Sequence, residues 1–134
     1  MNDPLLFDTS VWIDFLNIRS GRGSDLLGRY IAEDFPVIIT PVIYQEILQG
    51  IQDDGDFEQT KDLLSAFSIL DLPAIEAAGG AAALYRDLRK KGITIRKSND
   101  CLIAFYAIYF DIPLVHKDRD FTLIAQHTPL KILL

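Results

Sequence analysis

Short apolar runs alternate with longer segments of helical spacing along the chain, and this pattern predicts strands alternating with helices. Val37–Thr40 is β-branched and apolar on both sides, as a buried parallel strand should be. The other predicted strands are Leu5–Phe7, Ser68–Leu70, Pro113–Val115 and Lys131–Leu133. Because strands joined through helices form a parallel sheet covered on both faces, we expect an α/β fold. The expected architecture is a three-layer α/β/α sandwich with a central parallel sheet of about five strands.

Capping residues indicate where two helices begin, and glycines indicate where a third is less stable. Ser24 is expected to cap a helix that runs to about Glu33, and Ser98 to cap a later one. Gly79 and Gly80 are expected to weaken the middle of an alanine-rich helix. The remaining predicted features are that alanine-rich helix after Pro73, a helix after Pro41, helices at Val11–Leu16, Phe57–Phe67 and Phe121–Gln126, and a turn at Asp53–Asp56.

The composition is that of a globular protein, and we expect residues 1–134 to form a single domain. Apolar residues make up 49% of the chain and charged residues 24%. The one cysteine, Cys101, excludes an internal disulfide framework and a cysteine-based zinc site. Neither a signal peptide nor an apolar stretch long enough to span a membrane is visible, so the expected location is the cytoplasm.

The net charge of −6 argues against a protein that coats nucleic acid through bulk charge. Basic residues are nevertheless concentrated in one segment, with two more further on. These residues are Arg86, Arg89, Lys90, Lys91, Arg96, Lys97, Lys117 and Arg119. They predict either a basic rim that contacts RNA phosphates or a solvated helix end whose cations suit the helix dipole.

Acidic residues recur near the carboxyl ends of the predicted strands, where ligands bind in open α/β sheets. Asp8 directly follows the first strand, and Glu46 lies in the second turn of the helix after Pro41. Asp100 lies in the first turn of the helix that opens at Ser98, and Asp118 comes three residues after the fourth predicted strand. These acids therefore converge on one edge of the sheet, with Asp120 close by.

Carboxylates that share a pocket repel one another, and a hard divalent cation with oxygen ligands removes that repulsion. A metal held by such acids implies metal-assisted hydrolysis of a phosphate ester. Asp8 and Asp100 are equally compatible with helix caps, Glu46 with an exposed helical residue, and Asp118 and Asp120 with turn residues. Spacing alone leaves both interpretations open.

Four stretches in order, "LLFDTSVWIDFL", "PVIYQEILQG", "SNDCLIAFYAI" and "LVHKDRDF", resemble the PIN-domain family, and within it the VapC-type toxins of toxin–antitoxin pairs. The resemblance spans Leu5 to Phe121. It implies an acidic quartet of Asp8, Glu46, Asp100 and Asp118, with Asp120 as a more variable acid. It implies that Ser10 supports the site, with Thr40 and Asn99 as further polar supports. His116 departs from the pattern, since the family usually has Thr or Ser there.

The resemblance also implies an activity and partners. Members of the family are Mg²⁺- or Mn²⁺-dependent endoribonucleases, often specific for tRNA or rRNA, commonly dimeric and neutralised by an antitoxin. We expect Asp8, Asp100 and Asp118 to hold Mg²⁺, or Mn²⁺, with Glu46 acting directly or through water. The apolar residues Val11, Trp12, Phe15 and Leu16 of the first helix fit either an antitoxin groove or burial in this chain's own core.

Three other functions compete with the nuclease. A non-catalytic PIN-like interaction domain should have lost one or more acids, yet all four positions are occupied. A phosphatase with an aspartate nucleophile would need a second Asp where Ser10 stands, and a signalling receiver would need an acidic pair after the first strand. The sequence favours the nuclease.

Overall fold

A parallel five-stranded sheet in the order β3-β2-β1-β4-β5 forms the centre of the fold. The computed structural model describes residues 2–133. The strands are β1 (Leu5–Phe7), β2 (Val37–Ile39), β3 (Ser68–Ile69), β4 (Leu114–Val115) and β5 (Ile132–Leu133). Every neighbouring pair is parallel, so the predicted fold class is confirmed.

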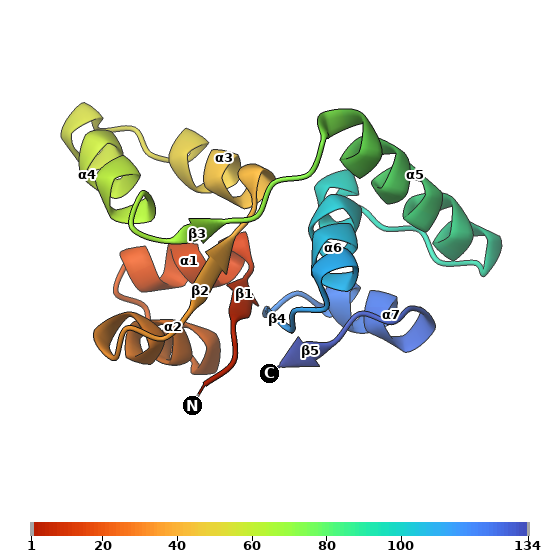
Figure 1. The fold of residues 1–134 in the computed structure, drawn as a ribbon, viewed down its shortest axis with the longest axis horizontal. Coiled ribbons are helices and arrows are strands. Elements are labelled where there is room, and N and C mark those ends of the chain that lie inside the picture. Colours follow the sequence, from red (N-terminus) through yellow and green to blue (C-terminus); the bar gives the residue numbers. More distant parts are fainter. Residues whose placement is uncertain (1, 134) are drawn as a thin grey trace.

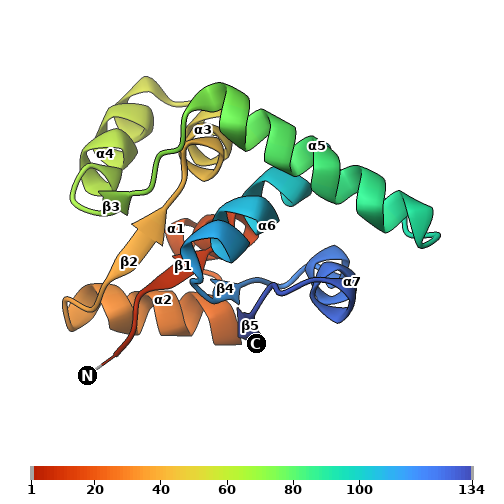
Figure 2. The same ribbon diagram turned by 45° about the vertical axis from the view of Figure 1, so that its right-hand side comes forward.

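Helices flank this sheet on both sides. They are α1 (Thr9–Leu16), α2 (Arg22–Ala32), α3 (Pro41–Gln49), α4 (Asp54–Leu64), α5 (Ala74–Lys90), α6 (Ser98–Phe110) and α7 (Arg119–His127). In Figures 1 and 2, α1 and α6 lie on opposite sides of β1, and α5 extends along the outside of α6. No helix within residues 2–133 combines the length and the apolar character that crossing a membrane requires.

The register of the sheet brings the ends of its strands together. Leu6 of β1 stands beside Ile38 of β2 on one side and Leu114 of β4 on the other. All three residues of β1 are buried, as expected of a central strand covered on both faces. Because the three central strands run in the same direction, the residues after Phe7, Ile39 and Val115 meet at a single edge.

The structure corrects three predictions near helix starts. Ser24 lies inside α2, where its hydroxyl donates to the Arg19 carbonyl oxygen at 2.8 Å, and α2 begins without a side-chain cap. The predicted turn at Asp53–Asp56 is wrong, because the Asp53 carboxylate accepts from the Asp56 amide at 2.9 Å and caps α4. Ser98 is the first residue of α6 and does not cap it.

The first helix, α1, contributes side chains to the core. Val11 is 1% exposed and Trp12 is fully buried. The Trp12 ring packs edge-on against Phe67, with ring centroids 5.5 Å apart. The two residues are thus unavailable to a partner, and of the two interpretations of this helix the structure has them in the core.

Two adjacent glycines of α5 have opposite surroundings. A side chain at Gly80 would overlap the Phe105 ring of α6, whereas a Cβ at Gly79 meets no atom within 4 Å. Alanine in a helix interior is favoured over glycine by about 1 kcal/mol. We therefore expect Gly79→Ala to raise the free energy of unfolding by about 0.5–1 kcal/mol. Gly80→Ala should lower it by about 1–2 kcal/mol, because overpacking outweighs that gain.

Urea unfolding of the two variants beside the unmodified chain measures both changes, and Gly79→Ala serves as the matched control. An equal gain in both variants would show that α5 does not pack closely on α6 at Gly80.

Candidate metal centre and active site

The fold delivers acidic side chains from four elements to the carboxyl edge of the sheet. Asp8 directly follows β1 and caps α1, while Asp118 follows β4 and caps α7. Glu46 comes from the second turn of α3, and Asp100 from the first turn of α6. Each element begins at this edge because a parallel sheet sends every chain crossover from the same side.

One group of carboxylates is close enough to share an ion. Oxygens of Asp100, Asp118 and Asp120 all lie within 4.8 Å of one another. Asp120 was expected only as a possible ligand, yet it belongs to this group, while Asp8 does not. The Asp8 carboxylate is instead turned toward Ser10, whose hydroxyl and amide donate to Oδ2 at 2.6 and 3.2 Å.

Asp100 is the acid least satisfied by the protein. It is 5% exposed, and its Oδ2 atom has no hydrogen-bond partner among the described residues. Burial, assisted by the negative charges of Asp8, Asp118 and Asp120, raises the pKa of Asp100 from its ordinary 3.8 to about 7, although Lys97 opposes this. A positive group beside the free oxygen would therefore favour the ionised form of Asp100.

Asp8 is also buried, but it is better supported. Burial raises the pKa of Asp8, and the negative charge of Glu46 adds to this, while the hydrogen bonds from Ser10 and from the Thr9 backbone lower it. The Ser10 hydroxyl thus holds Asp8 in one orientation, as expected of a supporting group. Its part in catalysis stays a prediction.

Glu46 is held from two sides. The Thr9 hydroxyl donates to Glu46 Oε1 at 2.6 Å, and the Asn99 side-chain amide donates to Oε2 at 3.3 Å. Thr9 was missed in the sequence, where the only available signal was a second hydroxyl directly after Asp8. Thr40 is buried and caps α3 by accepting from the Ile43 amide at 3.4 Å, so its contact supports the helix that carries Glu46.

Two of the predicted RNA-binding cations instead contact the acids. The Lys97 ammonium lies 3.2 Å from Asp118 Oδ2, and Arg96 lies 3.4 Å from Asp120 Oδ2 and 3.8 Å from Asp118 Oδ1. Although burial opposes ionisation of Asp118, the Asp120 amide, Lys97 and Arg96 hold the pKa of Asp118 below its ordinary value. The hydrogen bond to Asp118 raises the pKa of Lys97, so this ammonium stays charged.

The other predicted cations lie elsewhere. Lys117 pairs with Asp14 of α1, at 2.6 Å. Arg89 stacks over the Tyr85 ring, with its guanidinium carbon 5.7 Å from the ring centroid. Arg86 and Lys90 are exposed on α5, and Arg119 begins α7.

Comparison with known proteins decides the family. A family model described as "PIN domain" matches residues 5–126. The chain belongs to the PIN-domain family. Ribonuclease VapC11 of Mycobacterium tuberculosis is 32% identical over 128 residues, which cover 95% of this chain and 96% of that protein. VapC ribonuclease Mb1587 of Mycobacterium bovis matches equally, with 32% identity over the same shares.

Solved structures share the PIN fold. A chain in the crystal structure of VapBC2 from Rickettsia felis, bound to a promoter DNA fragment, superposes with a TM-score of 0.76 at 21% identity, covering 98% of both chains. A toxin–antitoxin complex from Klebsiella pneumoniae gives a TM-score of 0.68 at 25% identity, covering 96% of this chain and 99% of that one. The predicted resemblance is thereby confirmed.

The acids of this PIN domain fit the divalent metal that the family generally uses. Carboxylate oxygens are the ligands that Mg²⁺ and Mn²⁺ prefer. The buried Oδ2 atom of Asp100, which accepts no hydrogen bond from the described residues, gives the cluster an oxygen that a divalent ion could bind. The identity of the metal stays a prediction.

His116 is a packing residue at the border of this site. It is 5% exposed and lies edge-on against Phe121, with ring centroids 5.5 Å apart. Burial lowers the pKa of His116, so the ring is neutral near pH 7. Neither ring nitrogen has a hydrogen-bond partner within residues 2–133, and His116 does not join the carboxylate group around Asp100.

Proposed function

We propose that this PIN domain is a Mg²⁺- or Mn²⁺-dependent endoribonuclease that hydrolyses RNA phosphodiester bonds and acts as the toxin of a toxin–antitoxin pair. The observation that carries the proposal is the carboxylate group of Asp100, Asp118 and Asp120, with one buried oxygen left free. The curated relatives support it, since they are named as VapC ribonucleases.

In this proposal the acids have two roles, metal binding and positioning of the attacking water. Asp100, Asp118 and Asp120 hold the metal, and Asp8 with Glu46 hold the water that attacks the phosphodiester. Ser10 and Thr9 keep those two acids oriented through their hydroxyl hydrogen bonds, both 2.6 Å long. When bound, the divalent ion lowers the pKa of a coordinated water and offsets negative charge on the phosphoryl oxygens.

RNA binding is assigned to Arg96 and Lys97, which contact the acids, and to the basic residues of α5. Arg86, Arg89 and Lys90 lie on α5, which packs against α6, the helix that carries Asp100. In a chain with a net charge of −6, such local cations supply the attraction to phosphates. A tRNA or rRNA substrate and a cytoplasmic location stay predictions.

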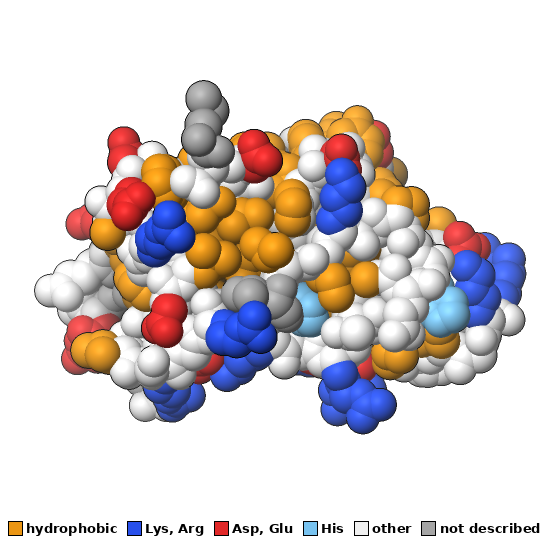
Figure 3. Space-filling model, turned by 90° about the horizontal axis from the view of Figure 1, so that it is seen from below, with side chains coloured by type: hydrophobic (Ala, Val, Ile, Leu, Met, Phe, Trp, Pro, Cys, Tyr) orange, Lys and Arg blue, Asp and Glu red, His pale blue; other side chains and the backbone are white. Residues whose placement is uncertain are grey.

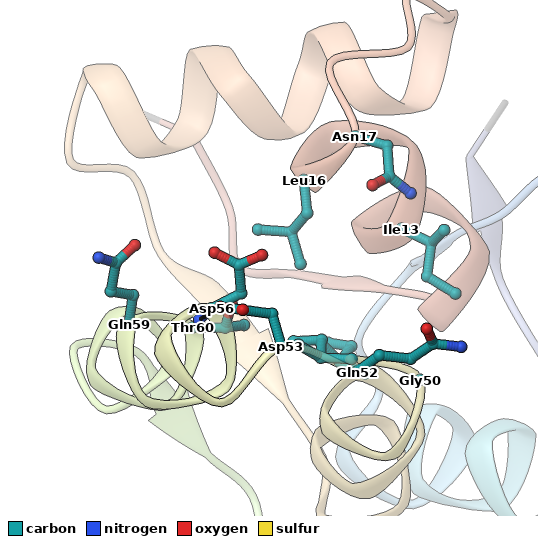
Figure 4. Close-up of a pocket in the computed structure, with 11 residues that line it drawn as sticks. Ile13, Leu16, Asn17, Gly50, Gln52, Asp53, Asp56, Gln59 and Thr60 are labelled. Atoms are coloured by element: carbon teal, nitrogen blue, oxygen red, sulfur yellow. Dashed lines mark hydrogen bonds between the residues drawn. The ribbon is translucent and has the colours of Figure 1, made fainter.

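The antitoxin is assigned to a groove of about 590 Å³ between α1, α3 and the start of α4. Figure 4 shows Leu16 of α1 facing the start of α4, where Asp53 and Asp56 lie at the rim. A segment that presents apolar side chains with Lys or Arg beside them fits this groove. Structures similar to this chain include VapBC complexes, which supports an antitoxin partner.

We further propose that the toxin forms a homodimer. On the face seen from below, hydrophobic side chains gather in the middle and charged side chains lie around them (Figure 3). A contact surface with an apolar centre and a polar rim is typical of stable interfaces.

The competing function is a non-catalytic PIN-like interaction domain. Purified protein, free of antitoxin, is incubated with pooled tRNA and rRNA in Mg²⁺, Mn²⁺ or EDTA, beside Asp8→Asn. We expect metal-dependent cuts that EDTA and Asp8→Asn both suppress, because Asp8 lies at the same sheet edge as the metal-binding acids. Full cleavage by folded Asp8→Asn would contradict the assignment of this acid. No cleavage by the folded, metal-loaded protein would favour the interaction domain.

A further inference from the structure

Lys97 and Arg96 contact the cluster formed by Asp100, Asp118 and Asp120. They are consecutive residues in the segment that leads into α6, and both contact Asp118, at 3.2 and 3.8 Å. Arg96 also reaches Asp120, at 3.4 Å. Two protein cations thus contact carboxylates that form the candidate metal centre.

These two cations are much more exposed than the acids that they contact. The side chains of Lys97 and Arg96 are 64% and 70% exposed, whereas Asp118 and Asp120 are 16% and 7% exposed. The acids are therefore largely enclosed by the protein, whereas both cations border the solvent. An ion pair with one exposed member contributes little, so a divalent ion bound by several carboxylates can displace it.

The position of Lys97 differs from that of the other lysines. Its ammonium is influenced by Asp100 and Asp8 as well as by Asp118, so it lies within the field of acids from three elements. Lys117 pairs with Asp14 instead, and Lys131 with Asp111. Among the ion pairs of the described residues, only those of Lys97 and Arg96 involve the cluster of Asp100, Asp118 and Asp120.

We propose that Lys97 and Arg96 are displaceable counter-cations, which neutralise Asp118 and Asp120 until a divalent ion binds and then turn toward the phosphates of the RNA. The inference rests on the proposed metal-dependent function. It adds a coupling between two ligands: the metal releases the cations that RNA needs, so each ligand tightens the binding of the other.

Metal affinity tests the first step. Isothermal titration of Mn²⁺ is compared in the unmodified protein, in Lys97→Met and in Lys61→Met, a control lysine on α4 away from the cluster. Removing an exposed competitor is expected to tighten Mn²⁺ binding about two- to fivefold in Lys97→Met, with no change in the control. Equal or weaker Mn²⁺ binding by folded Lys97→Met would overturn the proposal.

Amine labelling tests whether Lys97 remains paired with Asp118 when the metal binds. Lysines are modified with an amine-reactive ester in EDTA and in saturating Mg²⁺, and the labelling rate at each lysine is read by mass spectrometry. A freed Lys97 should label several-fold faster with Mg²⁺, while Lys61 labels at one rate. If Lys97 labels equally in both conditions, it stays on Asp118 and the displacement is wrong.

RNA binding tests the second step. The affinity for a short RNA is measured in EDTA and in Ca²⁺, with the RNA checked by gel for integrity. The metal-dependent gain should shrink in Lys97→Met and persist in Lys61→Met. If Lys97→Met keeps the full metal-dependent gain in RNA affinity, the proposal that Lys97 turns toward the RNA phosphates is wrong. If these binding results are obtained but no RNA is cut, the proposed nuclease activity is wrong, whereas the role of Lys97 and Arg96 as counter-cations is supported.

Discussion

Asp100→Asn is expected to reduce metal-dependent RNA cleavage by at least about a hundredfold, while the protein stays folded. Even residues that only orient metal ligands are worth about 10- to 100-fold. Asp100 supplies the one buried oxygen in the cluster that has no partner within residues 2–133. An asparagine of the same shape keeps the packing but removes the charge that a cation would neutralise. Initial rates on the RNA identified in the pooled assay, at saturating Mg²⁺ or Mn²⁺, measure the loss.

Asp111→Asn is the matched control at the other end of the same helix. Asp111 ends α6 in the left-handed region with φ of 55°, a conformation that asparagine also adopts readily. Its carboxylate is 74% exposed and pairs with Lys131. This variant should cleave RNA at the unmodified rate. Comparable losses in the two variants would mean that the charge of α6, and not a site at Asp100, supports activity.

The position of the acids was predictable from the sequence because it follows from topology. A strand followed by a helix places the first residues of every crossover at one edge of a parallel sheet, whichever side chains stand there. Asp8, Glu46 and Asp100 needed only a correct assignment of strands. The membership of the closest group was not predictable, because it depends on side-chain orientation. Asp8 accepts hydrogen bonds from Ser10 and lies outside the group of three carboxylates. Asp120, whose amide donates to the α7 cap Asp118, lies within that group.

The partners of the basic residues were equally beyond the sequence. Lys97 and Lys117 look alike as isolated cations, but one meets Asp118 and the other meets Asp14, 103 residues earlier in the chain. Such contacts join segments that are distant in sequence, so a local sequence pattern does not predict them. Helix starts failed for a related reason, since Ser24 has a good capping side chain whose hydroxyl finds the Arg19 carbonyl instead.

The stability of Asp100→Asn relative to the unmodified protein should depend on pH in a way that identifies Asp100. In the folded protein its pKa is about 7, against an ordinary 3.8, so the folded state binds the extra proton between those values. Linkage then requires the metal-free protein to lose stability as the pH rises from about 4 to about 7. Asparagine carries no such penalty. The variant should match the unmodified protein near pH 4 and exceed it by about 4 kcal/mol at pH 8.

Comparing the two proteins at each pH removes the contributions of groups that do not interact with Asp100, including His116, whose lowered pKa acts in the opposite direction below about pH 6.5. Urea unfolding in EDTA from pH 4 to pH 8 gives the difference profile, and a flat profile would contradict the raised pKa of Asp100. Saturating Mg²⁺ or Mn²⁺ should then reduce the stability difference between the two proteins at pH 8. A ligand at a hundred times its dissociation constant adds about 2.7 kcal/mol to a protein that binds it only when folded. The unmodified protein gains this because its ionised Asp100 becomes a ligand, whereas the variant gains less. The same carboxylate therefore destabilises the metal-free fold, and metal binding offsets part of that loss, as expected of a residue kept for binding and not for folding.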